Sequence, residues 1–381
     1  MRGTGGAGAG GTRGGGGGGV NLLALRSHNA ALVLDLLRTA GADGISRLEL
    51  AERTGLTPQA VSKITARLRE DGLAAEAGRR ASTGGKPRTV LRLVPEAGHA
   101  VGVHLDRDEV RAVLVDLRGT VVGERRAPLD LGAGARAVLT AVTEAVRETV
   151  AGVLPAGTLT RAGSLLGAGV ALPGPLDHAR GVLHRVTGFP EWDGFPLREA
   201  LAERLGVPVV VDKDTNAAAL GLAAGGEAGS FAYLHLGTGL GAGLVIGGSV
   251  HRGARTGAGE FGHQVIQLDG PPCTCGDRGC VEALCLGAVA RGDTAEAARV
   301  LGAGAANLVS LLDIDVVLLG GRTVATAPEV FVRGVGTVLE AWARRTGQEA
   351  VPVRVAAGGG RVVAVGAAQL VLGPVFGRGG G

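Results

Sequence analysis

The chain has 381 residues, 45% of them hydrophobic and 19% charged, so it is long enough for two or three domains with a sizeable core. Its 70 glycines follow no three-residue period, which excludes a collagen-like chain. No apolar run reaches the roughly 18–20 residues that span a bilayer, and residues 1–19 lack the apolar segment of a signal peptide. We therefore expect a cytoplasmic protein with no membrane partner and a disordered glycine-rich tail over residues 1–19.

The basic charge of the chain is concentrated near its N-terminus. Between Val20 and Arg92 there are twelve lysines and arginines and seven acidic residues, a difference of +5, whereas the whole chain carries +4. The remainder therefore sums to −1. A basic segment joined to a near-neutral body is typical of a nucleic-acid-binding module attached to a second domain.

Residues 20–95 have the pattern of a winged helix-turn-helix domain of the α+β class. Apolar spacing predicts a helix over 30–40, and Ser46 is placed to cap a second helix that runs to Thr54. Gly55 suits the turn and Pro58 opens a third helix, whose outer face is predicted to enter the major groove of DNA. The candidate DNA-contacting residues there are Thr57, Gln59, Ala60, Ser62 and Lys63.

A basic hairpin follows these helices. Strand-like runs over 73–78 and 89–94 bracket a glycine-rich segment that carries Arg79, Arg80, Lys86 and Arg88. We expect this hairpin to be a wing that contacts the phosphates of double-stranded DNA. The alternative to DNA binding for the whole segment is an exposed helical hairpin followed by an ordinary solvated loop.

From His99 onward the predicted elements repeat. The pattern indicates three strands, a helix over 135–152, a strand, a helix and a strand, and a similar series begins again near residue 231. This order predicts an internally duplicated α/β domain over 99–375, with halves at 99–225 and 226–375 and a ligand cleft between them.

Five phrases of this region occur together in an order that resembles one known family. They are GAGVALPGPL, VVVDKDTNAAALG, LHLGTGLGAGLVIGGSVHRGARTGAGEFGH, PPCTCGDRGCVEA and DIDVVLLGG. The chain from Val101 onward resembles the ROK family of repressors, open reading frames and sugar kinases, and the preceding winged helix is similar to that of ROK transcription regulators. The resemblance implies a duplicated α/β fold of the actin-like, ribonuclease H-like sugar-kinase type with a zinc-binding loop.

Three of the four cysteines lie within eight residues of one another, and a histidine precedes them. In a reducing compartment, clustered cysteines indicate metal binding or catalysis rather than disulfides. Four ligands at His263, Cys273, Cys275 and Cys280 suit tetrahedral Zn²⁺ in a closed structural site, and the resemblance implies the same four. Unrelated buried thiols and a redox pair are the alternatives, although a redox motif requires C-x-x-C. Cys285 falls outside the pattern and is expected to be buried in a helix.

The resemblance also implies which residues bind a sugar. In ROK sugar kinases, the residues that match Glu260, His263 and Glu282 hold sugar hydroxyls. Carboxylates and imidazole suit this task because each can accept a hydrogen bond from a hydroxyl. Asp214 matches the base that takes the proton from the attacking sugar hydroxyl and is a further candidate sugar ligand.

Two positions near these residues depart from the kinase pattern. Lys213 and Gly188 stand where the kinases keep asparagines that contact sugar. We expect the Lys213 ammonium to lie beside Asp214 and lower the pKa of its carboxyl, which leaves only a vestigial base.

The first phosphate loop departs further. Residues 102–108 read GVHLDRD where ROK kinases have a phrase like GIDIGGT. Carboxylates would repel a triphosphate, and side chains would block the approach of the backbone to the phosphates. We therefore expect no ATP site and no enzyme activity, although the glycine loops at Gly237–Gly243 and Gly320–Gly321 are retained.

Together these features predict a sugar-responsive transcriptional regulator, a repressor of carbohydrate-metabolism genes. A homodimer or homotetramer would match a palindromic operator, and a sugar or sugar phosphate in the cleft would change its DNA affinity. An ATP-dependent sugar kinase that carries a DNA-binding domain is the first alternative. A constitutive DNA-binding scaffold with a degenerate cleft is the second.

Overall fold

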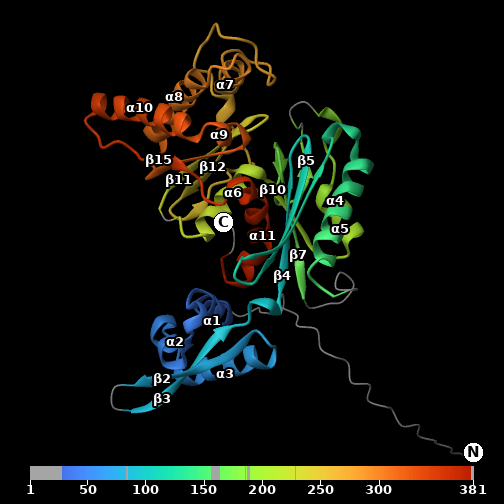
Figure 1. Cartoon of the computed structure of the whole chain (residues 1–381), viewed down its shortest axis with the longest axis vertical. Coiled ribbons are helices and arrows are strands. Elements are labelled where there is room, and N and C mark those ends of the chain that lie inside the picture. The colour runs from blue at the N-terminus through green and yellow to red at the C-terminus, as the bar shows by residue number, and fades with distance from the viewer. Residues whose placement is uncertain are drawn as a thin grey trace, which may run out of the picture.

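The computed structural model describes residues 28–82, 85–155, 164–184, 186, 189–227 and 229–378. The glycine-rich tail predicted over residues 1–19 lies outside this part of the chain. The described residues form a small N-terminal domain and two larger α/β lobes (Figure 1). Among their helices, none is both long and apolar enough to cross a membrane.

The N-terminal domain is a winged helix-turn-helix, as the sequence predicts. Ser46 caps the second helix in a capping box with Glu49, and Gly55 ends it in the left-handed conformation (φ 70°). Its sheet has the strand order β1-β3-β2. The elements are α1 His28–Thr39, η2 Gly41–Asp43, β1 Ile45–Ser46, α2 Arg47–Thr54, α3 Pro58–Glu70, β2 Ala74–Ser82 and β3 Gly85–Leu93.

The first lobe follows a short connection, η3 Pro95–Ala97. Its five-stranded sheet has the order β10-β7-β4-β5-β6. The elements are β4 His99–Leu105, β5 Glu109–Asp116, β6 Val121–Pro128, η4 Leu131–Ala133, α4 Ala135–Ala151, β7 Leu165–Leu172, β8 Leu176–Asp177, β9 Val182–Leu183, η6 Pro190–Trp192, α5 Leu197–Leu205, β10 Val209–Lys213 and α6 Asp214–Ala224.

The second lobe has a sheet of order β13-β12-β11-β14-β15. Its elements are β11 Phe231–Leu236, β12 Leu240–Ile246, β13 Ser249–Val250, η7 Phe261–His263, α7 Val281–Ala290, α8 Thr294–Leu312, β14 Val316–Gly320, α9 Arg322–Thr326, α10 Pro328–Thr346 and β15 Val353–Val355, and η8 Gly359–Arg361 and α11 Val362–Val375 complete the chain. Each sheet places its first strand in the centre, antiparallel to the second and parallel to the fourth. The two sheets therefore share one strand arrangement.

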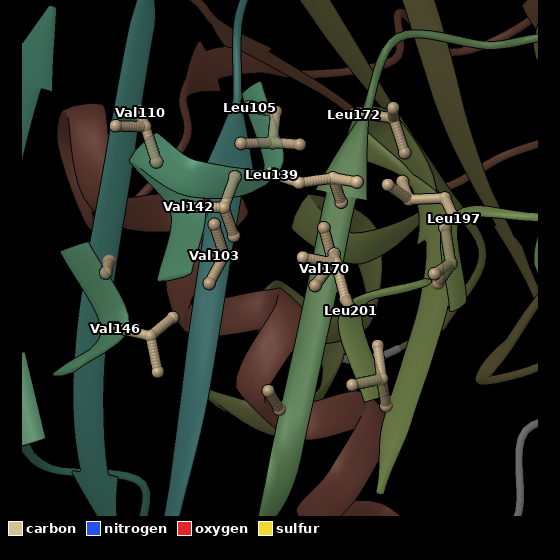
Figure 2. Close-up of a cluster of buried hydrophobic side chains, with 14 of the residues drawn as sticks. Val103, Leu105, Val110, Leu139, Val142, Val146, Val170, Leu172, Leu197 and Leu201 are labelled. Atoms are coloured by element: carbon tan, nitrogen blue, oxygen red, sulfur yellow. The ribbon is translucent and has the colours of Figure 1, made fainter. Parts of the chain in front are cut away.

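The core of the first lobe lies between its sheet and the helices α4 and α5. Figure 2 shows valines and leucines of β4, β5 and β7 interdigitating with those of the two helices. Side chains alternate along a strand, so Val103 and Leu105 of β4 face α4 and α5 while Gly102 faces α11. Burial on both faces explains why β4 and β7 are almost continuously apolar.

Helix α11 lies across the other face of this sheet, although the sequence assigns residues 362–375 to the second half. It packs against β4, β7 and α6 of the first lobe and shares a buried cluster with β11 and β14 of the second, so it joins the two lobes (Figure 1). Two glycines permit the close approach. A Cβ on Gly169 would lie 1.8 Å from the Ala367 oxygen, and one on Gly366 would lie 1.8 Å from the Ala217 oxygen.

The C-terminal end of α11 contacts the N-terminal domain. The Arg38 guanidinium lies 5.2 Å from the centre of the Phe376 ring, and Arg378 pairs with Asp35 at 3.1 Å. Apolar residues of α1 and α11 belong to one buried cluster. The connection between the N-terminal domain and the first lobe is therefore a packed interface as well as a covalent link.

We predict that Gly366→Ala lowers the free energy of unfolding by about 1–3 kcal/mol, because the added methyl group overpacks the contact between α11 and α6. Gly336→Ala on α10 is the matched control, since its added Cβ meets no atom within 4 Å. That change should raise stability by up to about 1 kcal/mol through helix propensity. Urea unfolding midpoints measure both, and equal midpoints for the two variants would contradict the packing account.

Candidate functional site

The candidate DNA-contacting residues of α3 lie on its outer face. Val61 and Leu68 are buried against the domain core, whereas Gln59, Ser62 and Lys63 are exposed. The helix begins where the Thr57 hydroxyl accepts a hydrogen bond from the Ala60 amide. Ala60 is half-buried and Thr57 is exposed. The helix thus presents short polar groups and one lysine to solvent.

Strands β2 and β3 pair as the expected hairpin. Arg79 and Arg88 are exposed. Arg80 pairs with Arg88 in the strand register, while the side chains of Arg80 and Lys86 lie outside the described part of the structure. In Figure 1 the hairpin extends from the N-terminal domain on the side away from the two lobes. Its position leaves it accessible to a long, charged partner.

A polar cavity of about 80 Å³ lies between the two lobes. All four candidate sugar ligands line it: Asp214, Glu260, His263 and Glu282. They come from the start of α6, the loop after β13, η7 and the start of α7. The structure therefore brings together residues that the sequence separates by up to 68 positions (282 − 214). Gly188, the other departure from the kinase pattern, lies outside the described residues.

The carboxylate of Glu282 is held by the second glycine loop. It is buried, and its Oε2 accepts a hydrogen bond from the Leu240 amide at 2.7 Å. A Cβ on Gly239 would lie 3.1 Å from the same oxygen. The glycine at position 239 thus leaves room for the Glu282 carboxylate.

The prediction that the Lys213 ammonium pairs with Asp214 is wrong. Lys213 Nζ donates instead to Glu260 Oε1 at 2.8 Å and to the Ala258 oxygen at 2.7 Å. Asp214 Oδ1 accepts a hydrogen bond from the Thr215 amide, next to it at the start of α6. The lysine stem runs past Gly174, and the ammonium contacts the loop of the second lobe that carries Ala258 and Glu260.

A buried ion pair fixes the strand end that carries Lys213 and Asp214. Asp212 is 1% exposed, and its Oδ2 accepts a hydrogen bond from Arg252 Nε at 2.8 Å. Its Oδ1 accepts from Asn216 Nδ2 at 2.9 Å. This pair was not predicted from the sequence. The four-residue spacing of Asp212 and Asn216 is a local signal, but Arg252 lies 40 positions away from Asp212.

The first phosphate loop is tied to the second lobe. Arg322, directly after the glycines 320–321, donates to both oxygens of Asp108 at 2.6 and 2.8 Å and also binds Asp106. Thr238 donates to Asp106 at 3.2 Å. Hydrogen bonds from Arg322 hold the pKa of the Asp108 carboxyl below its usual value. The carboxylates expected to face a triphosphate therefore bind an arginine that the sequence analysis did not single out.

Two histidines lie at equivalent places in the two repeats, near the ends of β4 and β11. The rings of His104 and His235 meet edge to face with centroids 6.4 Å apart. The Tyr233 hydroxyl lies 2.9 Å from His235 Nδ1. Burial in the cleft lowers the pKa of His104 to about 4, so this imidazole is neutral at pH 7.

The four candidate metal ligands converge. His263 Nδ1 lies 3.7 Å from Cys273 Sγ, Cys275 Sγ lies 3.7 Å from Cys280 Sγ, and all four ligand atoms are within 4.8 Å of one another. Such a cluster could hold a metal ion. Cys285 stays outside it, buried in α7 as predicted, and its thiol donates to the Ala297 oxygen.

The cluster adjoins the part of the cavity that His263 and Glu282 line. His263 belongs to both the cluster and the cavity lining, and Cys280 caps the helix whose first turn carries Glu282. The cluster therefore connects His263 and Glu282, two of the candidate sugar ligands, through one compact loop.

Comparison with protein-family models identifies two regions. Residues 33–74 match a winged helix-turn-helix DNA-binding model, and residues 100–296 match the model of the ROK family. The chain belongs to the ROK family.

Several curated ROK proteins are similar in sequence. A putative xylose repressor of Caldicellulosiruptor sp. is 28% identical over 322 residues, covering 73% of this chain and 79% of the relative. The xylose repressor of Bacillus subtilis is 30% identical, covering 62% and 61%. The transcriptional dual regulator NagC of Escherichia coli is 31% identical, covering 69% and 64%. The matched region thus spans less than two thirds of the last two relatives.

Two solved ROK structures differ in the share of this chain that they cover. A ROK transcriptional regulator, homologous to the E. coli MLC protein, has a TM-score of 0.72 at 21% identity and covers 92% of this chain and 98% of its own. A ROK hexokinase from Thermus thermophilus has a TM-score of 0.59 at 32% identity and covers 73% and 99%. The regulator shares the fold of nearly the whole chain, whereas the hexokinase covers about three quarters of it.

The buried His104 predicts a loss of stability on acidification. Its pKa is about 4 in the folded protein and near 6.5 when unfolded, so between these values the unfolded chain binds more protons. Stability attributable to this group is complete above pH 6.5 and falls by about 2 kcal/mol on going from pH 7 to pH 5. Urea unfolding should show that His104→Gln removes this part of the pH dependence. His251→Gln, at an exposed histidine, should leave it unchanged.

Proposed function

We propose that this chain is a sugar-responsive, DNA-binding transcriptional repressor of carbohydrate-metabolism genes. The observation that carries the proposal is the combination within one chain of a winged helix-turn-helix with an exposed basic surface and a ROK domain whose polar cavity gathers four hydroxyl-binding side chains. Relatives named as xylose and N-acetylglucosamine repressors support it.

On this proposal α3 enters the major groove and the wing contacts the backbone. Gln59 and Ser62, with Thr57 and Ala60 beside them, face base edges, while Lys63 binds phosphate. The wing residues Arg79, Arg80, Lys86 and Arg88 bind further phosphates. Two-fold pairing of chains, as a homodimer or within a homotetramer, presents two such surfaces to an inverted repeat.

The effector is a sugar or sugar phosphate bound between the lobes. Asp214, Glu260, His263 and Glu282 accept or donate hydrogen bonds to its hydroxyls. The effector changes DNA affinity only if it binds one arrangement of the two lobes more tightly than the other. The cavity is lined by residues of both lobes, so its shape, and with it the affinity for the effector, depends on the relative position of the lobes.

Kinase activity is not part of the proposal. A phosphate loop acts through backbone N–H groups that approach the nucleotide closely. Here the side chains of Asp106 and Asp108 occupy that loop, and Arg322 crosses from the second lobe to bind both. Nucleotide binding would have to break these ion pairs and would bring the triphosphate against two carboxylates. Asp214 then remains a vestigial base and a sugar ligand.

We further propose that the cluster of His263, Cys273, Cys275 and Cys280 holds Zn²⁺ in a structural role. Three thiolates and one imidazole suit a closed tetrahedral zinc site. The Nδ1 atom of His263 faces Cys273, so its other ring nitrogen is free to face the cavity. The metal would fix the loop that carries the candidate sugar ligands.

The deciding experiment is a footprint on the DNA upstream of the gene for this protein, with and without a panel of sugars. We predict protection of an inverted repeat that one sugar relieves. Glu260→Ala should retain protection but lose the relief, since it removes a hydroxyl acceptor far from the DNA surface. Lys63→Ala should weaken protection at all sequences and reduce the salt dependence of binding by about one phosphate contact.

Either of two results would reject the repressor proposal. One is an absence of protection at low salt with zinc present, and the other is protection that no sugar alters. Persistent relief in Glu260→Ala would reject the cavity as the effector site while leaving the DNA-binding proposal in place.

We predict about one Zn²⁺ per chain for the purified protein, measured by elemental analysis. Cys275→Ser should release the metal and lower the thermal midpoint, because metal binding contributes to folding free energy. Cys285→Ser is the matched control, since its thiol lies outside the cluster, and it should retain the metal. Equal metal content in both variants would contradict the assignment.

A further inference from the structure

Lys213 is a buried cation at the sugar cavity, and its partner belongs to the other lobe. Its side chain is 4% exposed and extends from the end of β10 in the first lobe. The ammonium binds Glu260 Oε1 and the Ala258 oxygen, both in the loop after β13 of the second lobe. Taking an ammonium out of water is costly unless it is paired and hydrogen-bonded, and these two contacts provide both.

The surroundings of Lys213 are shaped to keep this geometry. A Cβ on Gly174 would lie 2.8 Å from Lys213 Cδ, so the turn packs directly on the lysine stem. A Cβ on Gly259 would lie 2.0 Å from the Ala242 oxygen, so the loop that offers the acceptors packs tightly on β12. The buried pair of Asp212 and Arg252 fixes the strand end from which the lysine starts. The position of the ammonium is therefore set by both lobes.

Glu260 differs from Lys213 because it remains accessible. Its side chain is 44% exposed and lines the cavity. A carboxylate has two oxygens, and the ammonium engages Oε1. The pairing restricts the rotation of the side chain and leaves Oε2 to accept a hydrogen bond from a ligand hydroxyl.

From these contacts we infer that Lys213 is a positioning residue for the effector, acting through Glu260. It pins one carboxylate oxygen across the two lobes so that the other meets a sugar hydroxyl in a fixed place. The inference rests on the proposed function, since it assumes that a sugar binds in this cavity. It assigns to Lys213 a role distinct from direct contact with the sugar.

The inference also links the Lys213–Glu260 pair to the arrangement of the lobes. The pair forms only when β10 and the loop after β13 lie at their present separation. A sugar that uses Glu260 Oε2 therefore favours this arrangement, because binding and pairing strengthen each other. Specificity follows for sugars with a hydroxyl at that position.

A double-mutant cycle tests the inference on the full-length, metal-loaded protein. Lys213→Met keeps the apolar stem and removes the ammonium, and Glu260→Gln keeps the shape and removes the charge. Isothermal titration with xylose, glucose, N-acetylglucosamine and the 6-phosphates of the two hexoses identifies the sugar that binds the wild type. Each single variant should weaken its binding about ten- to a hundred-fold. The double variant should bind no more weakly than the weaker single variant.

A second ion pair, between the segment just after α6 and strand β15, supplies the matched control. Arg354 and Glu227 lie 2.6 Å apart and away from the cavity lining. Arg354→Met, Glu227→Gln and their double variant should bind the sugar as the wild type does. Thermal midpoints of all variants without sugar report folding. If Lys213→Met does not fold, Lys213→Gln, which keeps a hydrogen-bond donor, should bind with intermediate affinity.

The outcomes separate the two proposals. Unchanged affinity in Lys213→Met, or in Lys213→Gln where that variant is used, overturns the inference alone. So does multiplication of the two losses in the double variant, which would show that Lys213 contacts the sugar independently, as an anion-binding group would. If no sugar of the panel binds the wild type, the proposed sugar response itself is rejected, and the inference falls with it.

Discussion

The close packing of α11 is the constraint on which the rest of the structure depends. This helix lies on the first sheet, against α6, and under the N-terminal domain at the same time. Gly169 lets the backbone of α11 approach β7 closely, and Gly366 lets it approach α6 closely. Its first residues, Val362 and Val363, line a cavity of about 190 Å³ between the lobes, and the residues just beyond its end, Phe376 and Arg378, contact α1. One rigid element therefore touches both the cleft and the domain proposed to bind DNA.

Polar contacts across the cleft determine how the lobes sit on this frame. Arg322 binds the first phosphate loop, Arg252 binds Asp212, and Lys213 binds Glu260. These three cations differ in burial, and therefore in the free energy needed to separate them from their partners. Arg322 is 45% exposed, so its attraction is weakened by salt and it can separate at modest cost. Arg252 and Lys213 are 7% and 4% exposed, and separating them would leave charges unpaired in a low dielectric. Of these three contacts, the one at the phosphate loop therefore costs the least free energy to separate.

Local patterns predicted most of the fold and the membership of the site. Ser46, Gly55 and the repeated strand order follow from capping, turn chemistry and side-chain alternation, which act within a few residues. The four candidate metal ligands span only 18 residues, from His263 to Cys280, so their spacing was enough to group them. Three features could not be found this way: the role of Arg322, the pairing of Lys213 with Glu260, and the packing position of α11. Each depends on residues 40 or more positions apart meeting across the duplicated lobes. The sequence pattern placed the Lys213 ammonium beside the Asp214 carboxylate, but in the structure it binds Glu260 and the Ala258 oxygen instead.

Under the proposed function, the loss of a nucleotide site and the gain of a regulatory one are connected. Arg322 of the second lobe pairs with Asp106 and Asp108 of the first lobe within the chain itself. On this proposal closure does not require a nucleotide, and the ligand that biases the lobes is the one in the cavity of Glu260 and Glu282. Under the proposed function, a single sugar therefore shifts the equilibrium by its full differential affinity, and α11 carries the change in lobe position to the α1 surface.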